Sequence, residues 1–172
     1  MELIIAEFVA GEVVKMLSPY CERIAIAGSI RRCRPVVNDI DLVLIPNDRN
    51  AIAGVLAKLG RLEMSGMKQA RFEMPVRMTQ KPSEGNTEVV QGAISIDVYY
   101  ATPENFVTLL LIRTGSVGNN IRLCSLAKSK GWRLAASGDG LFNERGERIA
   151  GDTEKSIYQA LGIPWLEPWE RG

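Results

Sequence analysis

The hydrophobic pattern of the chain changes its period close to Thr102, and this change limits the folds that are open to it. Upstream, apolar residues form short runs such as 40–45, as buried strands do. Downstream, they recur at helical spacing, first over 106–112. The sequence therefore predicts an α+β chain with two parts. A mixed β-sheet with helices is expected over 1–101, and a smaller, mainly helical lobe over 102–172.

The individual elements follow from the same pattern. We expect helices over 3–17, 50–59, 106–112, 118–130 and 153–161, and strands over 23–27, 40–45, 61–64, 70–76 and 89–100. Thr102 and Pro103 are suited to the N-cap and the first turn of the third helix. The segment 81–86 is rich in loop-forming residues and separates two strands.

The chain contains no histidine. This excludes histidine-based catalytic triads, zinc sites with imidazole ligands and histidine general bases. Any chemistry must use carboxylates, lysines, arginines, hydroxyls, thiols or a metal ion bound by oxygen. Three cysteines without CxxC spacing predict neither a disulfide framework nor a structural zinc site. The sequence also shows neither a signal peptide nor an apolar run long enough to cross a membrane. Together with the unpaired cysteines, this predicts a cytoplasmic protein that does not enter the membrane.

The charges nearly balance, with 21 lysines and arginines against 20 acids, but they are segregated along the chain. Between 105 and 138 there are five basic residues and no acid, and four arginines lie between 23 and 34. Acidic residues gather from Glu144 onward. Such segregation is compatible with a face that binds a polyanion, and also with ordinary solvated helices.

Three aspartates accompany apolar strands. Asp39 and Asp41 are two positions apart, so their side chains leave the same face of a sheet. Asp97 lies between Ile96 and Val98 on a separate strand. Carboxylates this close repel one another unless a cation lies between them. If the two strands are neighbours, the three carboxylates converge on a site that suits Mg²⁺ or Mn²⁺ and two-metal phosphoryl or nucleotidyl transfer.

A second motif precedes the aspartates. Gly28 and Ser29 stand at a predicted strand-to-helix turn, where backbone N–H groups, a hydroxyl and a helix dipole can bind a phosphate. Arg31 and Arg32 follow in the expected first turn, where at least one can reach a triphosphate. A Gly-Ser turn or an Asp-x-Asp strand alone has an ordinary structural explanation. Their occurrence in this order favours nucleotidyl transfer.

The motifs together resemble a known family. Gly28-Ser29-Ile30-Arg31-Arg32 followed by Asp39-Ile40-Asp41 is similar to the nucleotidyltransferase signature as it occurs in family X DNA polymerases. Thr114-Gly115-Ser116, Asn120 and Lys130-Gly131 keep the spacing of the helical lobe of polymerase beta and its bacterial relatives, and 149–165 resembles the end of a bacterial thumb. The resemblance covers nearly the whole chain.

The resemblance implies a nucleotidyltransferase palm over 1–101 and a nucleotide-selecting thumb over 102–172. The lyase domain, the helix-hairpin-helix modules and the phosphoesterase domain of larger members have no counterpart in these residues. The chain is similar in this respect to the small viral members, and a viral or phage origin fits it.

The same resemblance implies roles for individual residues. Asp39 and Asp41 would bind two Mg²⁺ ions, which Mn²⁺ can replace, and Asp97 would bind only the ion that activates the primer 3′-hydroxyl. The residues expected to hold the incoming nucleotide are Gly28, Ser29, Arg32, Asn38, Thr114, Gly115, Ser116 and Asn120. Those expected on DNA phosphates are Arg122, Lys128 and Lys130. The implied protein is a monomeric DNA polymerase that fills short gaps during repair, with primer–template or gapped DNA and a deoxynucleoside triphosphate as partners.

Two departures from the family pattern concern selectivity. Ile112 and Arg113 stand where relatives carry an aromatic pair at the sugar, and Cys124 stands where they carry an arginine near the template base. We therefore expect low fidelity and weak sugar discrimination, with ribonucleotides as further substrates.

Two other functions remain open at this stage. A small-molecule or RNA nucleotidyltransferase could use the same Gly-Ser and Asp-x-Asp core. A catalytically inactive module that binds DNA ends is the other alternative, although Asp39, Asp41 and Asp97 would then serve no purpose. Primer extension on a gapped duplex with Mg²⁺ separates the three.

Overall fold

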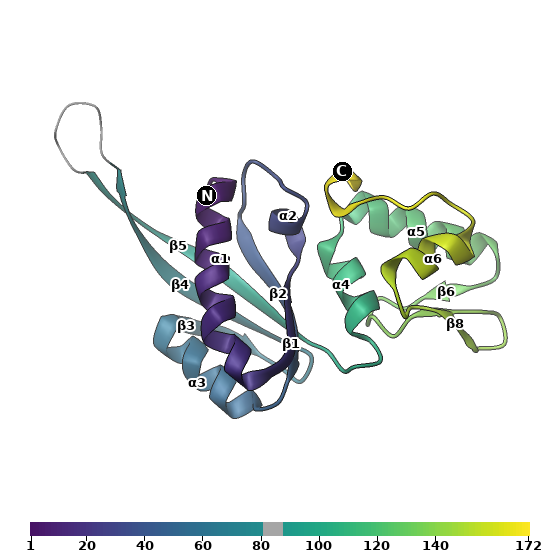
Figure 1. Ribbon diagram of the computed structural model, residues 1–172, viewed down its shortest axis with the longest axis horizontal. Coiled ribbons are helices and arrows are strands. Elements are labelled where there is room, and N and C mark those ends of the chain that lie inside the picture. The colour runs from purple at the N-terminus through teal and green to yellow at the C-terminus, as the bar shows by residue number, and fades with distance from the viewer. Residues whose placement is uncertain (81–87) are drawn as a thin grey trace.

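The computed structural model describes residues 1–80 and 88–172 and shows two lobes next to each other (Figure 1). The elements of the first lobe are α1 (Leu3–Leu17), a 3₁₀ turn (Ser18–Tyr20), β1 (Cys21–Ile26), α2 (Gly28–Arg31), β2 (Asp39–Pro46), α3 (Arg49–Leu59), β3 (Arg61–Ser65), β4 (Gln69–Gln80) and β5 (Glu88–Tyr100). Those of the second are α4 (Phe106–Thr114), α5 (Val117–Ser129), β6 (Arg133–Leu134), β7 (Leu141–Phe142), β8 (Arg148–Ala150), α6 (Glu154–Leu161) and a 3₁₀ turn (Pro168–Glu170). The predicted α+β fold class is confirmed.

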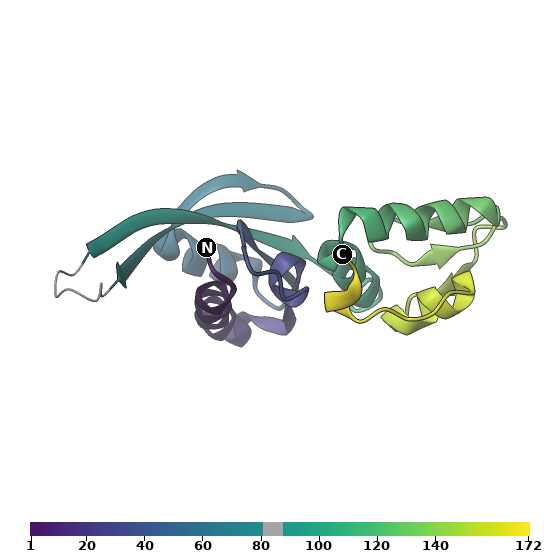
Figure 2. The same ribbon diagram turned by 90° about the horizontal axis from the view of Figure 1, so that it is seen from above.

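The first lobe is built on a five-stranded mixed sheet in the order β1-β2-β5-β4-β3. β2 and β5 are parallel, and the other neighbouring pairs are antiparallel. Helices α1 and α3 lie against one face (Figure 2). They pack there on the even-numbered apolar residues of β2 and β5, such as Ile40, Leu42 and Ile96, which are fully buried. Because side chains alternate along a strand, the odd-numbered residues lie on the face that these helices leave uncovered.

A separate apolar cluster joins the two lobes. Val43 and Tyr99 on the odd-numbered face pack with Phe106 and Leu109 of α4. The second lobe has its own core, in which Leu111 of α4 contacts residues of α5, α6 and the small sheet β6-β7-β8. Helix α4 thus contributes to both cores and fixes the position of its C-terminal end beside β2.

The predicted elements agree with the observed ones except in three places. Helix α4 begins at Phe106 as predicted, but its N-cap is Asn105 and not Thr102, because 102–105 form a turn in which Asn105 N–H and Phe106 N–H donate to the Thr102 carbonyl. Helix α2 is a single turn, so Arg32 lies beyond its end. The short strand β8 was not predicted. The loop predicted over 81–86 lies outside the described residues. Among the helices of the described residues, none combines the length and the hydropathy that a membrane span requires.

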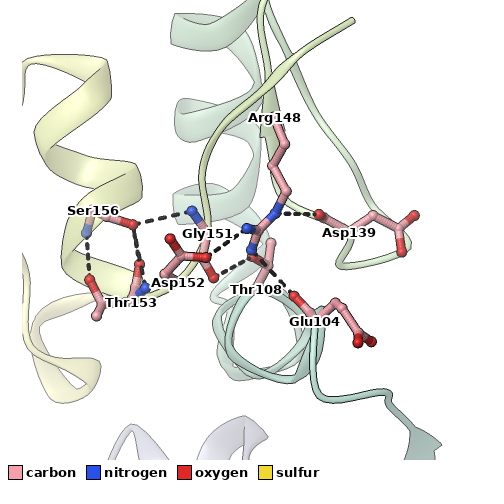
Figure 3. A network of polar contacts seen from close by, with 8 residues as sticks. All are labelled: Glu104, Thr108, Asp139, Arg148, Gly151, Asp152, Thr153 and Ser156. Atoms are coloured by element: carbon pink, nitrogen blue, oxygen red, sulfur yellow. Dashed lines mark hydrogen bonds and ion pairs between the residues drawn. The ribbon is translucent and has the colours of Figure 1, made fainter.

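The start of α6 is fixed by a polar network around Arg148 (Figure 3). The Arg148 guanidinium donates to the Asp139 carbonyl at 3.1 Å and to Oδ1 of Asp152 at 2.6 Å. Thr153 and Ser156 complete a capping box at the first turn of the helix. The network holds Glu154, the first residue of α6, in a defined place at the boundary between the lobes.

Candidate active site

The three predicted aspartates lie on the uncovered face of the sheet. The parallel register of β2 and β5 pairs Asp41 directly with Asp97, and Asp39 with Ser95. The two strands are therefore neighbours, which was the condition for the carboxylates to converge. Helix α4 packs on this face at Val43 and Tyr99, whereas Asp39, where β2 begins, is half-buried.

The electrostatics of Asp41 reflect this crowding. Burial, and then the negative charges of Asp39 and Asp97, raise the pKa of Asp41 to about 7. A hydrogen bond with the Tyr99 hydroxyl and the positive charge of Arg113 act in the opposite direction. Ionisation of Asp41 is therefore unfavourable until a cation binds beside it.

Asp97 is 1% exposed, and an arginine of the neighbouring strand binds its carboxylate. Arg71 lies opposite Asp97 in the β4–β5 register and donates from Nε to Oδ1 at 2.7 Å and from Nη2 to Oδ2 at 2.6 Å. Gln69 adds a longer contact to Oδ1 at 3.4 Å. Within residues 1–80 and 88–172, no three acidic or cysteine side chains lie close enough to one another to bind a single metal ion.

Gly28 lies directly above Asp41. Its φ is +60°, and a Cβ at this position would come within 1.8 Å of Oδ2 of Asp41, so only glycine fits. The Ala27 N–H donates to the Asp41 carbonyl at 2.8 Å and ties the turn to β2. The Oγ of the next residue, Ser29, is buried and has no hydrogen-bond partner among the described residues. A buried hydroxyl without a partner, one residue after the glycine that contacts Asp41, is a place where a ligand oxygen can bind.

The two arginines of the motif point to the second lobe. Arg32 donates to the Thr114 carbonyl, and burial, followed by the charge of Arg34, lowers its pKa. Arg31 donates to Thr114 Oγ1 at 2.7 Å and to Oε1 of Glu154 at 2.6 Å. The expectation that both arginines extend from the first turn of a helix is therefore wrong, because α2 ends at Arg31. Arg32 remains close to Asp39 and Asp41, whose charges act on it.

The predicted turn 114–116 lies opposite this motif. Thr114 is fully buried, and a Cβ at Gly115 would be 3.2 Å from Nη1 of Arg32. Ser116 caps α5 and donates its hydroxyl to the Arg171 carbonyl at 2.5 Å. Asn120 donates from Nδ2 to the Ile112 carbonyl at 2.8 Å. The structure thus brings the turn and Asn120 together with Arg32.

The remaining predicted residues are more dispersed. Arg113 stacks on the ring of Tyr99, with 4.1 Å between its guanidinium carbon and the ring centroid, while Ile112 packs on the core of the second lobe. Four predicted residues are exposed to solvent, and no hydrogen bond or ion pair among the described residues joins their side chains to the aspartates. They are Asn38, Arg122, Lys128 and Lys130.

Sequence reasoning missed four residues that this site contains. Tyr99 carries a signal in the sequence, since it is two positions from Asp97 and therefore shares its face of the strand. Arg71 could not be found without the β4–β5 register. Glu154 and Arg171 form an ion pair at 2.7 Å, with the Arg171 side chain fully buried. They connect the C-terminal segment to Arg31, and nothing local in the sequence indicates this.

Comparison with known proteins shows which proteins this chain is similar to. The family described as DNA polymerase beta thumb matches residues 109–172. The DNA polymerase/3′-5′ exonuclease PolX of Bacillus subtilis is 28% identical over 93% of this chain and 26% of its own length. The Repair DNA polymerase X of African swine fever virus is 26% identical over 94% of this chain and 86% of its own length. A polymerase beta of Leishmania infantum, solved as a ternary P/T complex, covers the whole chain and 76% of its own with a TM-score of 0.76 and 21% identity, which shows the same fold.

These matches show that most of the chain is similar to family X DNA polymerases, as the motifs had indicated. The chain spans less than a third of the length of three curated relatives that match it at 27–30% identity, one of them the Bacillus protein. It spans most of the viral relative.

The raised pKa of Asp41 predicts a pH dependence of stability in metal-free protein. The folded chain keeps a proton on Asp41 that the unfolded chain releases near pH 4, so this contribution to stability is lost as the pH rises through about 7. In a chelating buffer, the free energy of unfolding of the wild type should fall by about 2–4 kcal/mol relative to Asp41→Asn between about pH 4.5 and 8. Urea unfolding at each pH measures this difference.

The control is Asp152→Asn, at an exposed carboxylate of the second lobe, whose pH profile should follow the wild type. Parallel profiles for the wild type and Asp41→Asn would contradict the assigned crowding of the aspartates.

Proposed function

We propose that this chain is a template-directed DNA polymerase that adds nucleotides to a primer 3′-hydroxyl. The observation that carries the proposal is the pairing of Asp41 with Asp97 on adjacent parallel strands, beneath the Gly28-Ser29 turn. Similarity to family X DNA polymerases supports the same activity, and the viral relative is named a repair enzyme. We propose short-gap filling in DNA repair as its role.

The donor set of the site suits divalent cations. Its three carboxylates supply oxygen ligands only, which Mg²⁺ and Mn²⁺ prefer. The raised pKa of Asp41 reflects burial and neighbouring negative charge, which a bound cation would offset. Two such ions, when bound, would neutralise the phosphates and lower the pKa of the primer hydroxyl. Asp39 and Asp41 would hold both ions, whereas Asp97 would hold only the one beside that hydroxyl. Asp97 would also take part in removing the hydroxyl proton.

The nucleotide would lie between the two lobes. Gly28, through its backbone, Ser29, through its buried hydroxyl, and Arg32 would bind the β- and γ-phosphates, with Asn38 beside them. The helix dipole contributes little here, because α2 is only four residues long. The turn 114–116 would contact the sugar, and Asn120, whose Oδ1 is buried without a partner in the described chain, would approach the base.

The nucleic acid would be held by charge. Arg122, Lys128 and Lys130 are exposed on or directly after α5 and would contact phosphates without sequence preference. We propose that residues 1–101 act as the palm and 102–172 as the thumb of a monomeric enzyme. Cys124, exposed on α5, would leave the nascent base pair unchecked and lower fidelity.

Primer extension on a gapped duplex with Mg²⁺ tests the proposed activity. Asp39→Ala, Asp41→Ala and Asp97→Ala should each lower the rate by at least about a thousandfold, because each removes a metal ligand. Glu144→Ala, at an exposed position of the second lobe, should extend primers like the wild type. DNA binding should be unchanged or tighter in the three active-site variants, since each loses a negative charge.

An Asp97→Ala variant with more than about a tenth of the wild-type rate would remove Asp97 from the mechanism. A wild type that transfers nucleotides to small molecules or RNA but does not extend primers would favour the other nucleotidyltransferase function.

Sugar discrimination should be weak. Ile112 fills less of the space beside the sugar than an aromatic residue, and rejection of one hydroxyl by shape alone reaches only about a hundredfold. We therefore expect the wild type to prefer deoxynucleotides over ribonucleotides in kcat/KM by less than about a hundredfold, and Ile112→Tyr to increase this preference. Ile121→Tyr, at an exposed position on α5, serves as the control and should leave it unchanged.

The opposite result is equally informative. Wild-type selectivity above about ten-thousandfold that Ile112→Tyr does not change would exceed what shape provides. The Ile112 carbonyl, which Asn120 holds in place, would then be the group that rejects the 2′-hydroxyl.

A further inference from the structure

Arg71 lies in the sheet so that its guanidinium meets Asp97 from the side of β4. The β4–β5 register places the two residues directly opposite each other. The two hydrogen bonds, at 2.7 and 2.6 Å, form the fork geometry in which arginine binds carboxylates most strongly. Both oxygens of Asp97 are therefore engaged from one side.

The two partners differ in how freely they can separate. The Asp97 side chain is 2% exposed, whereas that of Arg71 is 42% exposed. Asp97 is confined in the sheet, and its charge needs a partner in every state of the protein. Arg71 can leave for solvent without such a penalty. Another cation can therefore replace the Arg71 guanidinium while the Asp97 carboxylate stays in place.

The other two carboxylates lie on the opposite side of Asp97. Asp39 and Asp41 are on β2, whereas Arg71 is on β4, so β5 separates them. A metal ion shared by Asp97 and β2 must take an Asp97 oxygen that now accepts from Arg71. Among the residues that the structure describes, no group of three acidic or cysteine side chains is close enough to hold a metal ion.

We propose that Arg71 is a positioning residue that serves as the counter-cation of Asp97 in the metal-free protein and competes with the divalent metal ion for that carboxylate. The inference rests on the proposed function, because it takes Asp97 as a metal ligand. Arg71 holds the Asp97 carboxylate in a fixed orientation before the metal ion binds. Metal binding at Asp97 displaces the guanidinium and is weakened by the work of doing so.

Mn²⁺ binding to the protein without DNA, measured by the loss of the free-ion EPR signal, tests the competition directly. Arg71→Gln should bind Mn²⁺ about tenfold more tightly than the wild type, because the metal ion no longer displaces a bidentate partner. Arg71→Lys keeps the charge and loses the fork geometry, so its affinity should lie between the two. Arg61→Gln, at an exposed arginine of β3 that pairs with Glu63 and Glu73, should change the affinity by less than about twofold.

A second pair of variants separates competition from simple loss of positive charge. In an Asp97→Asn background, Arg71 has no carboxylate to protect, so adding Arg71→Gln should tighten Mn²⁺ binding by less than about twofold. An equal gain with and without Asp97 would overturn the proposal, and so would a wild-type affinity in Arg71→Gln and Arg71→Lys. Should Arg71→Gln fail to fold, Arg71→Lys decides alone, since unchanged affinity in it contradicts competition.

Failure of the proposed function gives a different result. If the wild type binds Mn²⁺, and Arg71→Gln binds it more tightly, but the wild type extends no primer, the counter-cation role is supported and the proposed polymerase activity is contradicted. If it extends primers but Arg71→Gln binds Mn²⁺ like the wild type, the activity stands and the competition falls.

Discussion

The parallel pairing of β2 with β5 is the constraint on which the rest of this structure depends. It places Asp41 opposite Asp97 with Asp39 nearby, and so concentrates negative charge on one face of the sheet. Several neighbouring residues contact these carboxylates or leave space for them. Gly28 leaves room above Asp41, Tyr99 contacts the same carboxylate, and Arg71 binds Asp97 from the other side. Such a concentration is unfavourable for folding alone, and it becomes useful when cations bind.

The second lobe is positioned by contacts that begin at the same motif. Arg31 and Arg32, which follow the Gly28-Ser29 turn, both reach Thr114 at the end of α4. Arg31 continues to Glu154, and Glu154 to the buried Arg171 near the end of the chain. The Gly28-Ser29 turn and the turn 114–116 are thereby held near each other, as the proposed nucleotide site between the lobes requires.

Features that depend on residues close together in the sequence can be predicted from it, whereas features that depend on distant residues cannot. Alternation along a strand is local, so the shared face of Asp39 and Asp41 is readable, and so is the helical period of α1, whose bounds agree with the prediction. The adjacency of β2 and β5 is not readable, because it depends on which strands pair across a separation of about fifty residues. Arg71 and Glu154 were missed for this reason. The length of α2 was misjudged because the chain leaves the helix at Arg32 to reach Thr114, a tertiary contact that outweighs local propensity.

The central claim is that Asp39, Asp41 and Asp97 together hold two divalent ions when DNA and nucleotide are present, and that Asp97 serves only one of them. Counting the Mn²⁺ ions bound to a complex with a dideoxy-terminated primer–template and the matching nucleotide tests it most directly. The account predicts two site-bound ions for the wild type and one for Asp97→Asn. Equal numbers in the two proteins, or no bound ion in the wild type beyond that carried by the nucleotide itself, would contradict it.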